Sequence, residues 1–266
     1  MQSSENIVEL DLFAGEQAKI GVVVHLYYFP EFIKIIERLS NINEPFDFIV
    51  TTPHGHLGLA CLASLMPKKC RSVKILHSNN QGRDMLPFLK LINAGLLTGY
   101  TKVLKLHTKR SPWVSGSAFP IKASNGSEWF LNSLESLLGN VSIVEDIQEK
   151  LDSQKSVMVA PYGSILGIDE WMGLNGIFFN EIVSLADPFW ATNRRKNFSA
   201  GSMYWLNNEL IALVKSLSLK NFGNLVEPIA TDGTFIHALE RAIGYLASKE
   251  ECGIAESIFY RSANTL

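Results

Sequence analysis

Apolar and polar positions alternate along this chain in two ways, one typical of strands and one typical of helices. From Ile20 a β-rich run, IGVVVHLYY, leads through Pro30 into EFIKIIERLSNI, where apolar residues recur at helical spacing. The same order of strand and helix returns in FDFIVTTP and GLACLASLM, in SVKILHSN and MLPFLKLINAG, and in KVLKLHT and EWFLNSLESLLGN. Further strands are predicted at SVMVAPYGS and AGSMYWL, and a closing helix at DGTFIHALERAIGYLA. The alternation predicts an α/β fold with a mostly parallel, twisted sheet flanked by helices.

The repeated pattern covers residues 20–247, and we expect it to form a single domain. A chain of 266 residues with 47% hydrophobic and 19% charged residues can bury a core of that size. The flanking residues are expected to form a polar N-terminal tail over 1–19 and a C-terminal extension over 248–266.

Charge and cysteine content exclude several classes of protein. The formal net charge is −2 and no long Lys/Arg block occurs, so we expect no nucleic-acid partner. The three cysteines, Cys61, Cys70 and Cys252, include no C-x-x-C pair, which argues against a disulfide framework or a zinc site.

The N-terminal residues, MQSSENIVELDLFAGEQ, are polar and acidic, whereas a signal peptide carries a basic segment followed by an apolar run. The most apolar stretches are shorter than the roughly 20 apolar residues that span a bilayer. We therefore expect a cytoplasmic protein whose contact with the inner face of the cell membrane is at most peripheral.

Polar side chains gather just after the predicted strands. In open α/β sheets, ligands bind beyond the carboxyl ends of the strands, where the strand order reverses. The residues at these ends are His25, Tyr27 and Tyr28; Thr51, Thr52 and Pro53; Asn79, Asn80, Gly82, Arg83 and Asp84; and His107, Lys109 and Arg110. We expect a cleft at this edge in which His25, Arg83, Asp84, Lys105, His107 and Lys109 come together.

The segment KVLKLHTKRS is the sharpest local feature. Lys105, His107 and Lys109 lie two residues apart, so on an extended strand they share one face. Such a cluster suits a diphosphate, whose negative charge grows as a glycosidic bond breaks. The alternative is an edge strand in which lysines discourage aggregation, although the apolar flanking residues favour a central strand.

Asp84 and the segment AGSMYW each have two interpretations. Asp84 precedes an apolar helix, where it is either a solvated N-cap or part of a ligand site, since the N–H groups of a helix start also attract anions. In AGSMYW, Gly201 and Ser202 are small enough for a sugar to approach the backbone closely. Trp205 is either a core residue or a sugar platform.

Asp232 stands at the start of the closing helix, in TDGTFIHALER. It is either a cap for that helix or a general base that receives a proton from an acceptor hydroxyl. If Asp232 only caps the helix, the base is to be sought among Asp169, Glu170, Asp187 and Glu227.

Taken in order, VHLYY, NNQGRDMLPFL, KLHTKRS, AGSMYW and TDGTFIHALER resemble the motif series of the rhamnan synthesis protein F family, over almost the whole chain. Members are associated with rhamnose-containing cell-wall polysaccharides and O-antigens, and they are regarded as sugar transferases. The resemblance implies transfer of a sugar, with L-rhamnose as a candidate, from a nucleotide diphosphate donor to a growing cell-surface polysaccharide or O-antigen. The implied partners are the nucleotide sugar, a lipid-linked or oligosaccharide acceptor, and other assembly enzymes.

The strand order also resembles a single GT-A-like glycosyltransferase domain, in which a donor half and an acceptor half are continuous. On this scheme the donor site is expected to comprise His25, Tyr27, Thr51, Asn80, Gly82, Arg83, Asp84, Lys105, His107 and Lys109. The acceptor site is expected to comprise Gly201, Ser202 and Trp205, with Asp232 as the base of an inverting reaction, although Asp232 lacks the usual acidic neighbour. The Asp-x-Asp metal motif is absent and KLHTKRS stands in its place, so we expect the basic residues to replace the metal and no cofactor to be needed.

Other functions fit the sequence less well. A non-catalytic sugar- or nucleotide-binding subunit of a polysaccharide assembly complex remains the alternative, against which Asp232 and the basic strand both argue. A dinucleotide-dependent oxidoreductase lacks support because VHLYYFPE follows the first strand in place of Gly-x-Gly-x-x-Gly. A serine hydrolase lacks support because no Gly-x-Ser-x-Gly occurs.

Overall fold

The computed structural model describes residues 7–12, 18–55, 58–109, 123–186, 196–217, 230, 232–249 and 253–258. The strands are β1 (Ile7–Asp11), β2 (Ile20–His25), β3 (Phe46–Thr52), β4 (Cys70–His77), β5 (Lys102–His107), β6 (Met158–Ala160), β7 (Ile165–Gly167), β8 (Asn197–Ser199), β9 (Tyr204–Asn207) and β10 (Ile254–Glu256). The α-helices are α1 (Phe29–Arg38), α2 (Leu59–Ser64), α3 (Met85–Asn93), α4 (Gly126–Leu138), α5 (Val141–Asp152), α6 (Gly176–Ala186), α7 (Asn208–Lys215) and α8 (Phe235–Lys249). Two short 3₁₀ helices are η1 (Leu39–Asn41) and η2 (Gly173–Asn175).

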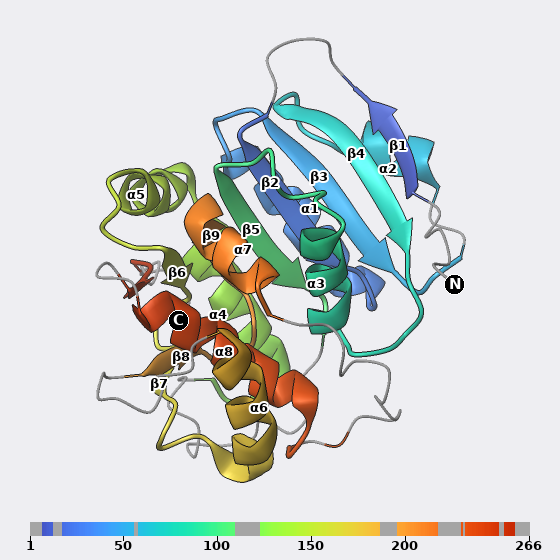
Figure 1. Ribbon diagram of the computed structural model, residues 1–266. Coiled ribbons are helices and arrows are strands. Elements are labelled where there is room, and N and C mark those ends of the chain that lie inside the picture. Colours follow the sequence, from blue (N-terminus) through green and yellow to red (C-terminus); the bar gives the residue numbers. More distant parts are fainter. Residues whose placement is uncertain are drawn as a thin grey trace.

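One eight-stranded sheet organises the protein, in the order β1-β4-β3-β2-β5-β9-β6-β10 (Figure 1). Strands β4, β3, β2 and β5 run parallel, and so do β6 and β10. Strand β9 runs antiparallel to both of its neighbours, and β1 runs antiparallel to β4. The predicted mostly parallel α/β fold is therefore confirmed.

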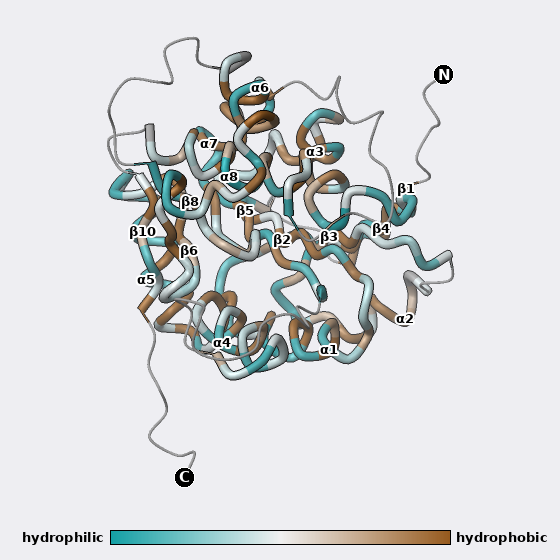
Figure 2. Tube along the Cα trace, turned by 90° about the horizontal axis from the view of Figure 1, so that it is seen from below, coloured by the Kyte–Doolittle hydropathy of each residue, from teal (hydrophilic) through white to brown (hydrophobic). Residues whose placement is uncertain are grey.

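Helices cover both faces of this sheet. Viewed end-on, the strands lie between α3, α6, α7 and α8 on one side and α1 and α4 on the other (Figure 2). Each side has its own apolar core, and β5 contributes to both, because Val103 packs into one core and Leu104 into the other. The basic residues of β5 therefore alternate with residues that anchor the strand in the centre of the sheet, as the sequence predicted.

Three helices begin at an asparagine that satisfies free N–H groups of the first turn. The side-chain oxygen of Asn125 accepts from two N–H groups of α4, that of Asn140 accepts from one of α5, and that of Asn207 accepts from one of α7. In α1, Pro30 lies in the first turn, where a missing N–H costs no hydrogen bond.

The sheet extends beyond the boundaries expected for the domain. Strand β1 lies within the expected tail 1–19 and pairs with β4, and β10 lies within the expected extension 248–266 and pairs with β6. All five residues of β1 are exposed, so the sequence holds no alternating burial pattern that marks it as a strand. Its attachment comes from the sheet hydrogen bonds and from an ion pair of Glu9 with Lys74 at 2.9 Å.

The strand order reverses between β2 and β5, since β3 and β4 both lie on the other side of β2. The carboxyl ends of these two strands are level, with His25 of β2 opposite His107 of β5. Ligands of open α/β sheets bind at such a reversal. Within the described part of the chain, none of the helices has both the length and the apolar character needed to cross a membrane.

Candidate functional site

Three strand ends are tied together at the reversal. His25 Nδ1 lies 3.0 Å from Thr51 Oγ1 on the neighbouring strand β3. Thr108, which directly follows β5, accepts hydrogen bonds at Oγ1 from the backbone N–H groups of Tyr27 and Tyr28, both at 2.8 Å. The predicted donor residues His25, Tyr27 and Thr51 are thus neighbours. Thr108 links the end of β5 to the residues that follow β2, a role that the sequence interpretation did not identify.

Lys105 forms a buried ion pair with Asp84. Its Nζ donates to Asp84 Oδ2 at 2.6 Å and to the carbonyl oxygen of Ser202 at 2.7 Å, while Ser202 Oγ donates to the same Asp84 oxygen at 2.6 Å. The two charged side chains are only 1% and 3% exposed. Burial alone would raise the pKa of Asp84, but attraction to Lys105, His107 and Lys109 outweighs it and holds that pKa well below its usual value. The charge of Lys105 is therefore compensated inside the protein.

Asp84 occupies the N-cap position of α3, but its side chain makes no capping hydrogen bond there. Lys105 and Ser202 take up the carboxylate instead. The capping interpretation of Asp84 is therefore wrong, because its carboxylate binds Lys105 and Ser202 and makes no hydrogen bond to the N–H groups of the helix start. The contact also places the side chain of Lys105 on the side of the sheet where the loop with Arg83 lies.

His107 is a neutral imidazole in this network. Its Nδ1 accepts from the backbone N–H of Lys109 at 3.1 Å, so its Nε2 carries the proton and donates to the carbonyl oxygen of Gly201 at 2.7 Å. Burial lowers the pKa of His107 from 6.5 to about 4. Burial also lowers the pKa of His25 to about 4. Neither ring carries a positive charge near neutral pH.

The turn between β8 and β9 is held from several sides. Gly201 and Ser202 have φ angles of +91° and +53°, in the left-handed region that glycine adopts at low cost. The N–H of Gly201 donates to Glu240 Oε1 on α8 at 2.7 Å, and its carbonyl is bound by His107. The side chains expected in the donor site therefore directly support the turn expected to meet the acceptor.

Trp205 lies in the core. It is fully buried on the side of the sheet opposite its neighbour Tyr204, and its Nε1 donates to the carbonyl oxygen of Leu137 at 3.2 Å. Because adjacent residues of a strand point to opposite faces, the position that brings Tyr204 toward Lys105 turns Trp205 away from it. The expectation that Trp205 contacts a sugar has no support in this arrangement.

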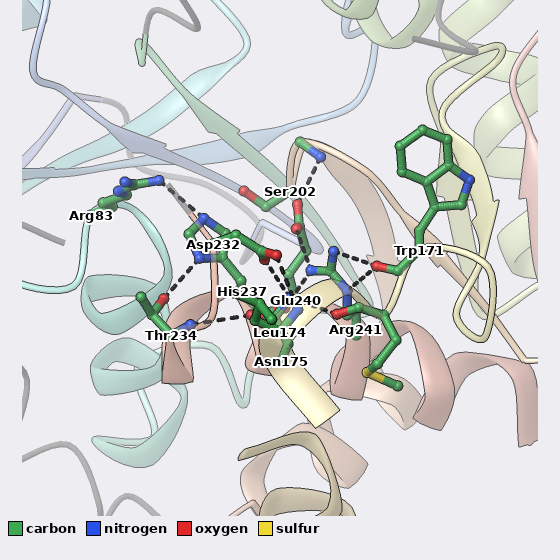
Figure 3. Close-up of polar contacts among 12 residues, drawn as sticks. Arg83, Trp171, Leu174, Asn175, Ser202, Asp232, Thr234, His237, Glu240 and Arg241 are labelled. Carbon is green, nitrogen blue, oxygen red and sulfur yellow. Dashed lines mark hydrogen bonds and ion pairs between the residues drawn. The ribbon is translucent and has the colours of Figure 1, made fainter. Parts of the chain in front are cut away.

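Arg83 and Lys109 are the remaining basic residues of the predicted donor site. Arg83 Nη1 lies 3.3 Å from His237 Nε2 (Figure 3). Arg83 Nη2 donates to the carbonyl oxygen of Ala230 at 3.2 Å. Burial lowers the pKa of Lys109; Asp84 opposes this shift and the charge of Arg83 adds to it. The two cations are thus close enough to repel each other. Gly82, with φ +70°, turns the loop before Arg83, and Asn80 is exposed on the same loop.

The pKa of His237 reports the same concentration of positive charge. Burial, together with the charges of Arg83, Lys109 and Arg241, lowers this pKa from 6.5 to about 4, and Asp232 opposes the shift. Its Nδ1 lies 2.8 Å from Thr234 Oγ1. The sequence interpretation did not single out His237, although a polar residue inside an apolar helix could have drawn attention to it.

Asp232 holds the short helix η2. Its carboxylate accepts from the backbone N–H of Leu174 at 3.1 Å and from Asn175 Nδ2 at 2.5 Å (Figure 3). Burial would raise its pKa, but these hydrogen bonds, the N–H of Gly233 and the charge of Arg241 lower it overall. The two other described carboxylates considered as bases, Asp169 and Glu170, are exposed, while Asp187 and Glu227 lie outside the described residues.

Glu240 is a carboxylate that the sequence interpretation missed. Its Oε1 accepts from Gly201, its Oε2 lies 3.8 Å from Arg241 Nη1, and the side chain is 15% exposed. Arg241 is held in place by the carbonyl oxygens of Trp171 and His237 (Figure 3). His237 and Glu240 lie three residues apart, which places both on one side of α8. That spacing inside an apolar helix was the available signal.

Metal ligands do not gather among the residues that the structure describes: no group of three or more His, Cys, Asp or Glu side chains there is placed to hold an ion. Metal independence itself stays a prediction.

Comparison with known proteins adds a family. The model of a family described as rhamnan synthesis protein F matches residues 3–252. Among curated proteins, the chain is similar to "Uncharacterized protein WxcX" of two strains of Xanthomonas campestris pv. campestris, each 25% identical over 223 residues. The match covers 84% of this chain but 30% of each relative, so the chain spans less than a third of the length of these relatives.

Proposed function

The chain belongs to the rhamnan synthesis protein F family, and from this premise we propose that it is a glycosyltransferase of polysaccharide synthesis. It moves a sugar, with L-rhamnose as the first candidate, from a nucleotide diphosphate donor to a growing cell-surface polysaccharide or O-antigen. The observation that carries the proposal is the placement of two cations, Arg83 and Lys109, beside the reversal of strand order. Burial and the charge of Arg83 lower the pKa of Lys109, while Asp84 and Glu240 raise it. A diphosphate bound there would relieve the repulsion between the two cations.

Arg83 and Lys109 are proposed to bind the departing diphosphate. Lys105 and His107 are less suited to this role, because Asp84 compensates the charge of Lys105 and His107 is neutral. They support the site indirectly, because they bind the carbonyl oxygens of Ser202 and Gly201 and so fix that turn. Preorganised cations of this kind stabilise the negative charge that develops on a leaving group, by several kcal/mol in a site that excludes water.

The reaction is proposed to invert the anomeric configuration and to need no metal. The usual nucleotide donor of rhamnose has β configuration and the usual linkages are α, so a single displacement with a general base follows. Transfer that persists after exhaustive chelation would support metal independence. Transfer that vanishes with the chelator and returns with manganese or magnesium would refute it.

The first experiment is a thermal-shift screen against nucleoside diphosphates and nucleotide sugars, followed by a transfer assay with the ligands found. A ligand at a hundredfold over its dissociation constant stabilises the folded state by about 2.7 kcal/mol, which is readily detected. Lys109→Met should weaken binding by about tenfold or more, since a charge-assisted contact contributes roughly 1.5–3 kcal/mol. Because burial lowers the pKa of Lys109, the affinity should also fall as pH rises through that lowered pKa.

Lys155→Met is the matched control, because Lys155 is 69% exposed and contacts only Glu149, at 3.9 Å, among the ion pairs of the described residues. It should leave donor binding unchanged. Equal binding by Lys109→Met and the wild type would contradict the proposed diphosphate site. Donor binding without transfer to any acceptor tried would favour the alternative, a non-catalytic nucleotide-sugar-binding subunit.

A further inference from the structure

Building on the proposed transferase function, we infer that Glu240, and not Asp232, is the catalytic base that removes the proton from the acceptor hydroxyl. Asp232 was the candidate that the sequence favoured. The carboxylates near the site differ in how many partners occupy their oxygens, in their exposure and in their surroundings, and these differences select Glu240.

Asp232 and Asp84 are both poorly suited to accept a proton. Both oxygens of Asp232 accept hydrogen bonds from η2, and these bonds favour its ionised form and weaken it as a base. Asp84 is 3% exposed and its Oδ2 is occupied by Lys105 and Ser202. A general base must come within hydrogen-bond distance of the substrate proton, and the buried carboxylate of Asp84 is not accessible to a substrate.

Glu240 combines fixed orientation with access. The N–H of Gly201 holds Oε1, while the nearest ion-pair partner of Oε2 among the described residues, Arg241, is 3.8 Å away, beyond hydrogen-bond distance. The side chain keeps 15% of its surface exposed. One oxygen therefore positions the group and the other remains to meet a hydroxyl.

The surroundings of Glu240 strengthen it as a base. Burial raises its pKa; Arg241 on the same helix, Lys109 after β5 and the N–H of Gly201 oppose this, and Asp84 at the start of α3 adds to it. His237, one turn earlier on α8, is neutral near pH 7. A base is most effective when its pKa lies near the working pH, and the net upward shift moves Glu240 in that direction.

Glu240 also lies beside both halves of the proposed reaction. The charges of Glu240 and Arg83 both act on Lys109, which places the base in the neighbourhood of the proposed diphosphate site. The turn at Gly201 and Ser202, which the sequence assigned to the acceptor site, is bonded directly to Glu240 through the N–H of Gly201. The buried pair of Lys105 and Asp84 fixes that turn and thereby the position of the base.

The chemical step balances without a further reactant. The acceptor oxygen forms a bond to the anomeric carbon of the donor, and the bond from that carbon to the diphosphate oxygen breaks. The electron pair of the broken bond leaves with the diphosphate, beside Arg83 and Lys109. The hydroxyl proton passes to Glu240 Oε2, which returns it to solvent after the products leave.

The test compares Glu240→Gln with Asp232→Asn in the transfer assay. Glutamine keeps the size of the side chain and an oxygen for the N–H of Gly201, but it accepts no proton. Glu240→Gln should lower kcat by about 10²- to 10⁴-fold and leave the dissociation constant of the nucleotide sugar within about threefold. Asp232→Asn should keep most of the turnover. The rise of kcat/KM with pH, which the ionisation of Glu240 produces in the wild type, should disappear from the residual activity of Glu240→Gln.

Each result decides the question. Near-normal turnover by Glu240→Gln overturns the inference, and loss of turnover confined to Asp232→Asn returns the role to Asp232. A wild-type protein that neither binds nor transfers any sugar overturns the proposed function, and the inference with it. If Glu240→Gln does not fold, the dependence of the wild-type kcat/KM on pH decides. The ordinary pKa of glutamate is about 4.3. A fall of kcat/KM in acid with an apparent pKa at or below that value overturns the inference, and a fall with a higher apparent pKa supports the inference.

Discussion

At the scale of single residues, the most consequential feature is the ion pair of Lys105 and Asp84. It joins the central strand β5, the start of α3 and the turn before β9, segments that are far apart in the sequence. Buried pairs of this kind seldom add net stability over apolar residues, but breaking one leaves an uncompensated charge in the interior. We regard it as a positioning device for the site.

Replacing one partner of this pair should therefore be costly. Asp84→Asn leaves the ammonium group of Lys105 buried without its counter-ion, and we expect it to lower the free energy of unfolding by about 3–5 kcal/mol, measured by urea denaturation. Adding Lys105→Met to Asp84→Asn should recover part of that loss, because the unpaired charge is removed. Asp146→Asn, which breaks a partly exposed pair with Lys150 one helical turn away, is the control and should cost less than about 1 kcal/mol. A loss as small as the control's for Asp84→Asn would contradict this account.

At the scale of elements, the site depends on how closely α8 packs against β8. Helix α8 carries His237, Glu240 and Arg241, and it crosses β8 at Gly244. A Cβ atom at Gly244 would overlap the backbone of Phe198 and lie 2.7 Å from the carbonyl oxygen of Asn197. Only glycine allows this approach, so the position of Glu240 relative to Gly201 rests on a residue that has no side chain.

Gly244→Ala tests that contact. Alanine favours a helix by about 1 kcal/mol over glycine, yet we expect a net loss of roughly 1–3 kcal/mol in the free energy of unfolding, because α8 must move away from β8. Gly176→Ala at the start of α6 is the control, since its nearest atom, in Met172, would be 3.7 Å away in ordinary contact. Gly176→Ala should be neutral or slightly stabilising. An increased free energy of unfolding in Gly244→Ala would show that the packing of α8 against β8 has room for a methyl group at this position.

At the scale of the whole molecule, two buried neutral histidines make the fold sensitive to acid. His25 and His107 titrate near pH 6.5 when unfolded and at about 4 when folded. The unfolded chain therefore binds protons first as pH falls, so stability is fully present above about pH 6.5 and is lost progressively down to about pH 4. The loss is roughly 3 kcal/mol or less for each histidine.

Urea denaturation at a series of pH values between 7 and 4.5 measures this dependence. His107→Gln removes one titrating group while its amide can still donate to the carbonyl oxygen of Gly201, so the decline of stability with falling pH should become shallower. An unchanged decline in His107→Gln would mean that other groups govern the acid sensitivity.

The sequence alone was sufficient for the α/β class, the strand and helix alternation from Ile20, and the edge of the sheet where polar residues gather. These features follow from periodicity within short segments and from the rule that parallel strands present their carboxyl ends together. The sequence did not predict strands β1 and β10, because these short strands at the sheet edges lack the alternation of buried and exposed residues that marks a strand.

Only the tertiary structure decided which charged groups meet. Asp84 pairs with Lys105 instead of capping α3, Trp205 faces the core, and Glu240 reaches Gly201 from a helix 39 residues further along the chain. A single sequence shows which side chains share a face of one element, but not which faces of distant elements pack together. The partner of a buried charge depends on that packing, because burial penalises any charge that the fold leaves unpaired.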